Sequence, residues 1–210
     1  MKKIAIYVEG GGPTHKTQDL IRRGFAEFFG PAARAARMCG GYVRTIPCGG
    51  RREAYDKFCD ALIHDPDIFN LLLVDAEDPG ARMDSPWAHL RNRPGDGWAQ
   101  PAGADNTRCQ MMVVCMEAWF LADPAGLKKH FGGNFDEGKL PPANQAESRN
   151  KADINDALKR ATRNTKAGEY QKIRDGAKLL EKIDPAEVRK HCKWCERLFK
   201  TLEQAMGATV

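Results

Sequence analysis

The first 133 residues alternate between two hydrophobic patterns. Short apolar runs predict β-strands, and apolar residues at helical spacing between them predict helices. The strands are expected within residues 2–10, 41–50, 68–78 and 110–123, the last leading into a helix, and the intervening helices within 17–30 and 52–66. Alternation of this kind predicts an α/β fold, with a mostly parallel four-stranded sheet and right-handed crossovers.

The run Leu71–Val74 is apolar at every position, which predicts a central strand covered on both faces. Gly30 and Pro31 are expected to end the first helix. Residues 79–108 contain four prolines and four glycines and predict a long irregular segment with a functional role. Its two tryptophans, Trp87 and Trp98, either anchor it to the core or stack on nucleobases. Arginines in or beside this segment are candidates for contacts with a phosphate backbone, namely Arg82, Arg91, Arg93 and Arg108.

From residue 151 onward the pattern becomes entirely helical. Helices are expected at 151–164, 169–183 and 184–206, with Asp184 as the N-cap of the last and Pro185 in its first turn. A polar segment that includes Pro141 and Pro142 precedes them. The sequence therefore predicts an α/β domain over 1–133, a linker over 134–150 and a helical extension over 151–210 packed on the same domain.

The formal net charge is +5, and all of it arises after residue 142. Residues 143–210 carry 15 Lys and Arg against 10 Asp and Glu, whereas residues 1–142 carry 18 of each. A basic helical tail fits an anionic partner and equally fits a solvated helical surface. No apolar run approaches the roughly 20 residues that span a bilayer, and the first residues resemble a strand and not a signal peptide. We therefore expect a cytoplasmic protein without a membrane partner; its oligomeric state is left open.

The seven cysteines show no disulfide or zinc-ligand spacing. Cys192 and Cys195 form the only close pair, and in an amphipathic helix their spacing favours a shared buried face over a zinc site. All seven are expected to be free thiols.

Acidic residues follow several of the predicted strands. Glu9 ends the first strand, Asp75, Glu77 and Asp78 end the third, and Glu117 follows the fourth. Because side chains alternate along a strand, Asp75 and Glu77 are expected to face the same way and Asp78 the other. The carboxyl ends of parallel strands meet at one edge of a sheet, where ligands bind. Any single acid there more often caps a helix or faces water. Together, several carboxylates at one rim repel each other unless a cation lies between them, and oxygen ligands without histidine favour Mg²⁺ or Mn²⁺.

The stretch after the first strand, "EGGGPTHKT", suits an anion. Gly10 and Gly11 permit a tight turn that offers backbone N–H groups near a helix start. His15 and Lys16 follow within the same stretch and are candidate phosphate contacts. The spacing is not that of a Walker A loop, so no ATPase activity is expected of this chain.

These motifs resemble the Toprim fold, and four stretches resemble a family of small bacterial proteins related to RloB and to the OLD nucleases. The stretches are "VEGGGPTHKT", "LLLVDAEDP", "MMVVCMEAWFLAD" and "GEYQKIRDGAKLLEKIDPAEVR", which together extend over nearly the whole chain. The resemblance implies that Glu9 is a general base or metal ligand and that Asp75 and Glu77 bind the metal. It also makes Glu117 a further metal ligand. Tyr170 and Lys172 match the family's Tyr-x-Lys pair, with Tyr170 expected to contact the substrate and Lys172 the scissile phosphate.

Two positions fit the resemblance less well. It implies a histidine where this chain has Asp175, and it gives no role to Asp78.

The sequence thus leads us to expect a Mg²⁺- or Mn²⁺-dependent nuclease that cleaves DNA or RNA in bacterial defence against foreign nucleic acid. An ATPase encoded by a neighbouring gene is the partner expected for proteins of this type. Two alternatives stay open. One is a non-catalytic subunit that binds nucleic acid or an ATPase, and the other is a different phosphotransfer enzyme, which would require a nucleotide.

Overall fold

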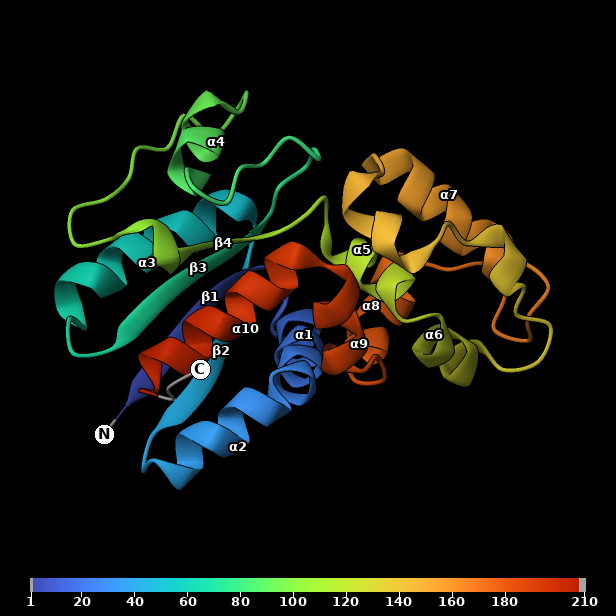
Figure 1. Ribbon diagram of the computed structural model, residues 1–210, viewed down its shortest axis with the longest axis horizontal. Coiled ribbons are helices and arrows are strands. Elements are labelled where there is room, and N and C mark those ends of the chain that lie inside the picture. Colours follow the sequence, from blue (N-terminus) through green and yellow to red (C-terminus); the bar gives the residue numbers. More distant parts are fainter. Residues whose placement is uncertain (1, 208–210) are drawn as a thin grey trace.

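A computed structural model describes residues 2–207 and has a four-stranded, all-parallel sheet (Figure 1). The strand order is β2-β1-β3-β4. The strands are β1 (Lys3–Gly11), β2 (Tyr42–Gly49), β3 (Phe69–Asp75) and β4 (Cys109–Met112). The predicted α/β fold is therefore confirmed, including the central position of β3, whose residues Leu71–Val74 are completely buried.

Helices lie on both faces of the sheet (Figure 1). The chain moves from β1 outward to β2 and then back past β1 to β3, so α1 and α3 must lie on opposite faces. The helices that follow β1, β2 and β3 are α1 (His15–Phe28), α2 (Gly30–Met38), α3 (Arg51–His64) and α4 (Pro86–Asn92). After β4 come α5 (Met116–Ala122), α6 (Pro124–Phe131), α7 (Lys151–Thr162), α8 (Lys172–Leu180), α9 (Pro185–His191) and α10 (Lys193–Ala205).

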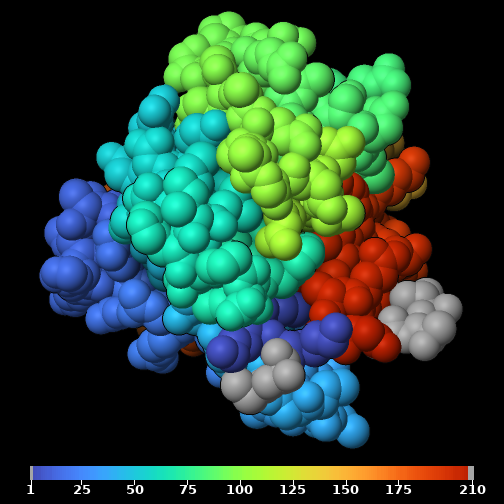
Figure 2. Space-filling model, turned by 90° about the vertical axis from the view of Figure 1, so that its left-hand side faces the viewer, coloured from blue at the N-terminus to red at the C-terminus, as the bar shows by residue number. Residues whose placement is uncertain are grey.

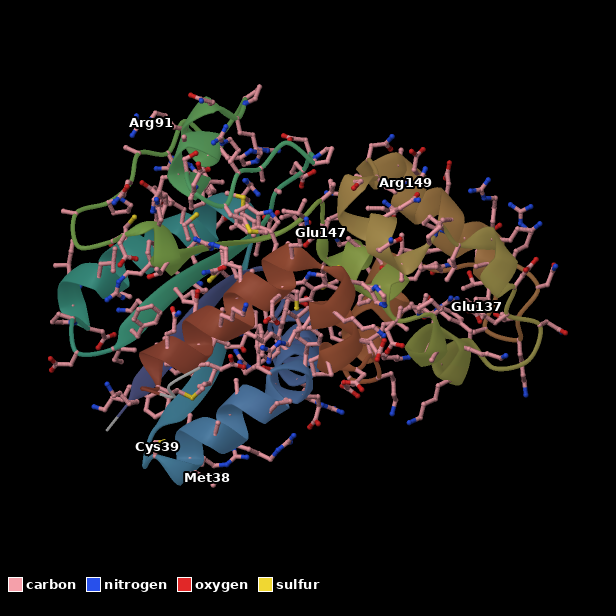
Figure 3. The ribbon with its side chains drawn as sticks, viewed as in Figure 1. Met38, Cys39, Arg91, Glu137, Glu147 and Arg149 are labelled. Atoms are coloured by element: carbon pink, nitrogen blue, oxygen red, sulfur yellow. The ribbon has the colours of Figure 1, made fainter. Side chains whose placement is uncertain are left out.

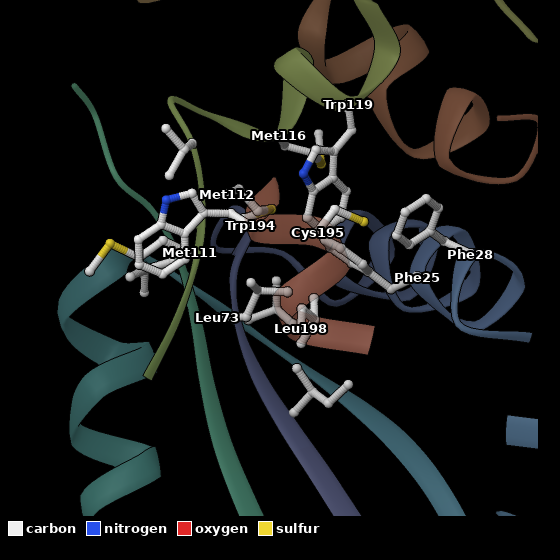
Figure 4. Close-up of a cluster of buried hydrophobic side chains, with 14 of the residues drawn as sticks. Phe25, Phe28, Leu73, Met111, Met112, Met116, Trp119, Trp194, Cys195 and Leu198 are labelled. Atoms are coloured by element: carbon white, nitrogen blue, oxygen red, sulfur yellow. The ribbon is translucent and has the colours of Figure 1, made fainter. Parts of the chain in front are cut away.

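The core on the α1 side is built from aromatic rings. Trp119 of α5 stacks on Phe28 of α1 with 4.8 Å between ring centroids, and it meets Phe25 edge to face at 6.3 Å. Phe199 of α10 meets Phe28 edge to face, with 5.8 Å between the ring centroids. Figure 4 shows Phe25, Phe28 and Trp119 of this cluster, with Cys195 of α10 beside Trp119 and Leu198 beside Leu73. The C-terminal helices thus belong to the main hydrophobic core.

The segment 79–108 is more regular than predicted because it contains α4 and a 3₁₀ turn, η1 (Asn106–Arg108). Trp87 and Trp98 are buried, with exposed fractions of 2% and 3%. Trp87 donates a hydrogen bond to the Asp105 carbonyl, and Trp98 stacks on Tyr55 of α3. The anchoring role predicted as one alternative is the one observed. Figure 2 shows this segment gathered beside α3 on one face of the molecule.

Three predicted helix boundaries were wrong. Gly30 and Pro31 do not close the first helical region but start α2 after a one-residue break at Phe29, because proline fits the first turn of a helix. The helix expected from residue 169 begins at Lys172, since Tyr170 and Gln171 are extended residues that precede it. The helix expected over 184–206 is divided at Cys192 into α9 and α10, although Asp184 and Pro185 start α9 as predicted.

The region 134–150 is structured and packs on the rest of the chain. It contains the 3₁₀ turns η2 (Glu137–Lys139) and η3 (Ala143–Ser148), and Ala146 is fully buried. Glu147 accepts hydrogen bonds from the backbone N–H groups of Lys193 and Trp194, both at 2.9 Å. It therefore caps α10, beside whose start it lies in Figure 3.

All seven cysteines are free, and Cys192 and Cys195 are both buried. Within residues 2–207, none of the helices has the length and apolar content that crossing a membrane requires.

Candidate functional site

Three carboxylates meet at the carboxyl edge of the sheet, where β1 and β3 lie side by side. Glu9 is near the end of β1, Asp75 is the last residue of β3, and Glu77 follows two residues later. One carboxylate oxygen from each lies within 4.8 Å of the other two. The strand ends point toward α5, α7 and α8 (Figure 1), so helices from the C-terminal half face this cluster.

Asp75 is the most buried member of the acidic cluster, with 4% exposure. Its Oδ1 accepts a hydrogen bond from the backbone N–H of Met116 at 2.9 Å, at the start of α5. Its Oδ2 lies 3.8 Å from Lys151 Nζ and 3.9 Å from Lys172 Nζ. Burial, reinforced by the charges of Glu9 and Glu117, raises the pKa of Asp75 to about 7 against the opposing effect of the two lysines.

Glu9 is held by a residue that the sequence reading did not single out. Arg51 Nη1 donates to Glu9 Oε2 at 3.0 Å, and the backbone N–H of Asp75 donates to the same oxygen at 3.2 Å. Arg51 also binds both carboxylate oxygens of Asp96 and the carbonyl of Asp75. Burial lowers the pKa of Arg51, but the hydrogen bonds and charges of Asp96 and Glu9 outweigh burial and raise this pKa above its usual value. Arg51 follows Gly49 and Gly50 at the end of β2. Ligands bind at the carboxyl ends of parallel strands, and this position, which indicated the acids, would also have indicated Arg51.

Glu77 reaches the cluster through an uncommon backbone conformation. Its φ is +72°, a left-handed conformation that side chains other than glycine rarely adopt. We expected Asp75 and Glu77 to share a face because strand residues alternate. This reason was wrong, because β3 ends at Asp75 and the left-handed turn brings Glu77 back.

Lys151, the first residue of α7, is the second contact that the sequence did not reveal. Its ammonium donates to both oxygens of Glu77, at 2.8 and 2.9 Å. Burial lowers the pKa of Lys151, but the hydrogen bond to Glu77 and the charge of Asp75 outweigh burial and raise it. No motif around residue 151 indicates this contact, which depends on how α7 packs.

Glu117 lies beside the acidic triad and not within it. It is fully buried and accepts hydrogen bonds from Tyr170 Oη at 3.1 Å and from Lys172 Nζ. Lys172 Nζ lies 3.2 Å from Glu117 Oε1 and 3.9 Å from Asp75 Oδ2, and so bridges the two acids. Burial opposes the charge on Lys172, but Glu117 and Asp75 outweigh it and raise the pKa of Lys172. The structure thus brings Glu117, Tyr170 and Lys172 together with the strand-end acids.

Tyr170 was expected to touch substrate, but its exposure is 2% and its hydroxyl faces Glu117. This position makes it a support for Glu117 and does not favour direct substrate contact.

The candidate anion-binding residues divide into two groups. Gly10 and Gly11 line a cavity beside Glu9, whereas His15 and Lys16 are exposed in the first turn of α1, outside the cavity lining. Both glycines have positive φ, and a Cβ on Gly11 would come within 2.9 Å of the Gln18 backbone, so the turn requires glycine there.

Asp78 and Asp175 serve the local backbone. Asp78 Oδ1 accepts from the Gly80 N–H at 2.7 Å. Asp175 is buried, accepts from the Gln171 N–H at 2.9 Å and pairs with Arg174. It therefore stabilises the start of α8, where the resemblance would place a histidine.

The donor set of the triad fits a small divalent cation. All three ligands are carboxylates, and one oxygen of each lies within 4.8 Å of the others. Opposite ligands on an ion bound at about 2.1 Å lie about 4.2 Å apart, which falls within that limit. Glu9, Asp75 and Glu77 would hold the ion, and Mg²⁺ or Mn²⁺ suits this oxygen-only set. Glu117, placed among the ligands by the sequence reading, is not one of the mutually close acids among the described residues.

The chain matches the model of a known protein family. Residues 8–203 match the model of a family described as "Domain of unknown function (DUF4276)". The chain belongs to the DUF4276 family. Neither the curated proteins nor the solved structures include a match. The DUF4276 match runs from the end of β1 into α10, so it includes the acidic triad together with both lysines that face it.

Proposed function

We propose that this DUF4276 protein is a Mg²⁺- or Mn²⁺-dependent nuclease of the Toprim and RloB-like kind that hydrolyses phosphodiester bonds of DNA or RNA. The observation that carries the proposal is the convergence of Glu9, Asp75 and Glu77 at the carboxyl edge of a parallel sheet, with Lys172 beside them. Carboxylates that hold a divalent ion beside a lysine are suited to phosphoryl chemistry.

Each residue of the site has its own role in the proposed reaction. Glu9, Asp75 and Glu77 form the cation site. Lys172, positioned by Glu117, would bind a non-bridging oxygen of the scissile phosphate and stabilise its growing negative charge. Tyr170 and Arg51 act as positioning residues, since they hydrogen-bond Glu117 and Glu9 respectively.

Hydrolysis needs no reactant besides water. The water oxygen forms a bond to phosphorus, one phosphorus–oxygen ester bond breaks, the water gives up a proton and the leaving oxygen gains one. A divalent cation would supply activation of that water and neutralisation of charge on the phosphate. Glu9, which keeps its Oε1 free of hydrogen bonds within residues 2–207, is the candidate to accept the proton.

The biological setting remains part of the same proposal. The excess of five positive charges after residue 142 would add affinity for the nucleic acid backbone. Defence against foreign nucleic acid and cooperation with a separate ATPase follow from the Toprim and RloB-like resemblance.

The test is cleavage of labelled single- and double-stranded DNA and RNA in Mg²⁺, Mn²⁺ or EDTA. We expect metal-dependent cutting that falls at least about 100-fold in Glu9→Gln and Asp75→Asn, because each removes a ligand. Asp67→Asn is the matched control, since Asp67 is exposed just before the opposite end of β3. Cutting that persists in EDTA or in both ligand variants would reject the proposal.

A second candidate function is binding without catalysis, and one observation favours it. The Lys151 ammonium already contacts both oxygens of Glu77 and lies 3.8 Å from Asp75, so a side-chain cation balances part of the acidic charge. A binding subunit of this kind would retain nucleic acid or ATPase binding in EDTA and in Asp75→Asn. Metal-dependent cleavage would exclude it.

A further inference from the structure

A cavity of about 380 Å³ opens beside the acidic triad. Its walls are the glycine turn after β1, the first turns of α1 and one side of α8. Glu9, Asp75 and Lys172 belong to its lining, so a ligand in the cavity would be continuous with a group bound at the triad. The volume lies within the range of small-molecule sites.

The rest of the cavity lining is mostly apolar. It includes Leu20, Ile21, Met116, Ile173 and Ala177. Ile173 is 85% exposed, and the other exposed large apolar residues within 2–207 are Met38 and Ile63. Of these three, Ile173 is the one that lines this cavity, which indicates that its exposure serves a ligand.

The glycine turn keeps one wall free of side chains. Gly10, Gly11, Gly12 and Gly49 all line the cavity, and all have positive φ. A Cβ on Gly49 would come within 2.9 Å of the Gly12 carbonyl, so the two segments touch backbone to backbone. A flat ligand can therefore approach this wall closely.

The two kinds of lining call for two kinds of group in one ligand. Glu9, Asp75 and Lys172 suit an anion with a bridging cation, and the apolar lining that includes Leu20 and Ile173 suits a flat apolar ring. A nucleotide joins a phosphate to such a ring. In a duplex the ring is paired and stacked, and it reaches a side pocket only when it is unpaired or flipped out.

We propose that this cavity binds an unpaired nucleobase next to the scissile phosphate, so that the substrate is a single strand or a flipped-out nucleotide. The inference rests on the proposed function only in taking the anion at the triad to be a nucleic acid phosphate. Leu20 and Ile173 are the residues that contact the base, from α1 and α8 respectively.

The test measures binding, with Ca²⁺ in place of Mg²⁺ to suppress cutting. Fluorescence anisotropy compares a labelled oligothymidine with a strand of equal length whose central nucleotides are abasic. We expect the abasic strand to bind about tenfold more weakly, as the loss of base contacts requires. Ile173→Ser should weaken oligothymidine binding severalfold without further effect on the abasic strand, and Ile173→Trp should tighten oligothymidine binding by offering a stacking surface.

Ile63→Ser is the matched control, since Ile63 is 72% exposed on α3 and does not line the cavity. Equal affinity for both strands, equal effects of Ile173→Ser and Ile63→Ser, or no measurable binding would overturn the inference.

The result of the binding test can be distinguished from the result of the cleavage assay. Metal-dependent cutting without base-dependent binding would reject the base pocket and leave the nuclease. Base-dependent binding without cutting would support the pocket and reject the nuclease.

Discussion

At the scale of single residues, the site pairs buried and half-buried acids with side-chain cations. Asp75, Glu9, Glu77 and Glu117 face Arg51, Lys151 and Lys172 within hydrogen-bond or ion-pair distance. Carboxylates that are desolvated and lie this near to one another favour a bound proton or cation. For this reason the pKa of Asp75 rises to about 7. A bound divalent cation would reduce the repulsion that remains between the carboxylates.

The left-handed conformation of Glu77 predicts a difference between two substitutions. Glu77→Gly and Glu77→Ala both lose the ion pair with Lys151, but only glycine accepts a φ of +72° without cost. We therefore expect Glu77→Gly to be more stable than Glu77→Ala by about 1 kcal/mol. Urea unfolding measures the difference, and equal stabilities would show that the backbone at residue 77 is unstrained or relaxes.

Lys151 competes with any cation bound at Glu77 and Asp75. Replacing it in Lys151→Gln removes one positive charge near the acids, so the affinity for Mn²⁺ should rise severalfold, on the order of 1 kcal/mol. Lys159→Gln, on the exposed part of the same helix, should leave the affinity unchanged. Isothermal titration calorimetry compares Mn²⁺ binding by the two variants. Weaker Mn²⁺ binding in Lys151→Gln would contradict competition between Lys151 and the cation.

At the scale of secondary-structure elements, short polar contacts decide where helices begin. Asp184, Asp123 and Asn150 cap α9, α6 and α7 through side-chain hydrogen bonds, and Glu147 caps α10 from a distant 3₁₀ turn. Local caps such as Asp184 can be predicted from sequence. The break between α9 and α10 could not be predicted from sequence. Glu147, which accepts hydrogen bonds from the backbone N–H groups at the start of α10, lies 45 or more positions earlier in the chain.

Glu147 gives the fold a pH dependence. Burial raises its pKa to about 7 in the folded protein despite two backbone hydrogen bonds, against an unfolded value of 4.5. The folded state therefore binds the proton more tightly, and this contribution to stability is complete below pH 4.5 and is lost as the pH rises through 7. Between pH 5 and 8 we expect Glu147→Gln to lose about 2–3 kcal/mol less stability than the wild type.

Urea unfolding at several pH values measures this slope. The difference between wild type and Glu147→Gln isolates the glutamate, because Asp75 titrates in both proteins. Parallel pH profiles would contradict the assignment.

At the scale of the whole molecule, the helical extension completes the site that the sheet begins. The triad comes from β1, β3 and the turn after β3, whereas Lys151 and Lys172 come from α7 and α8. The α/β fold, the acids and Lys172 could be predicted, since periodicity, strand-end position and motif resemblance are local signals. Lys151 and the burial of Tyr170 could not, because they depend on tertiary packing between residues that are far apart in sequence.

The central claim is that the triad holds a divalent cation, and calorimetric titration of the full chain with Mn²⁺ tests it most directly. We predict one binding site in the wild type, an affinity at least about tenfold weaker in Asp75→Asn, and no change in Asp67→Asn. Absence of Mn²⁺ binding to the wild type, or equal binding by Asp75→Asn, would contradict the claim and leave Arg51, Lys151 and Lys172 to balance the charge of these acids.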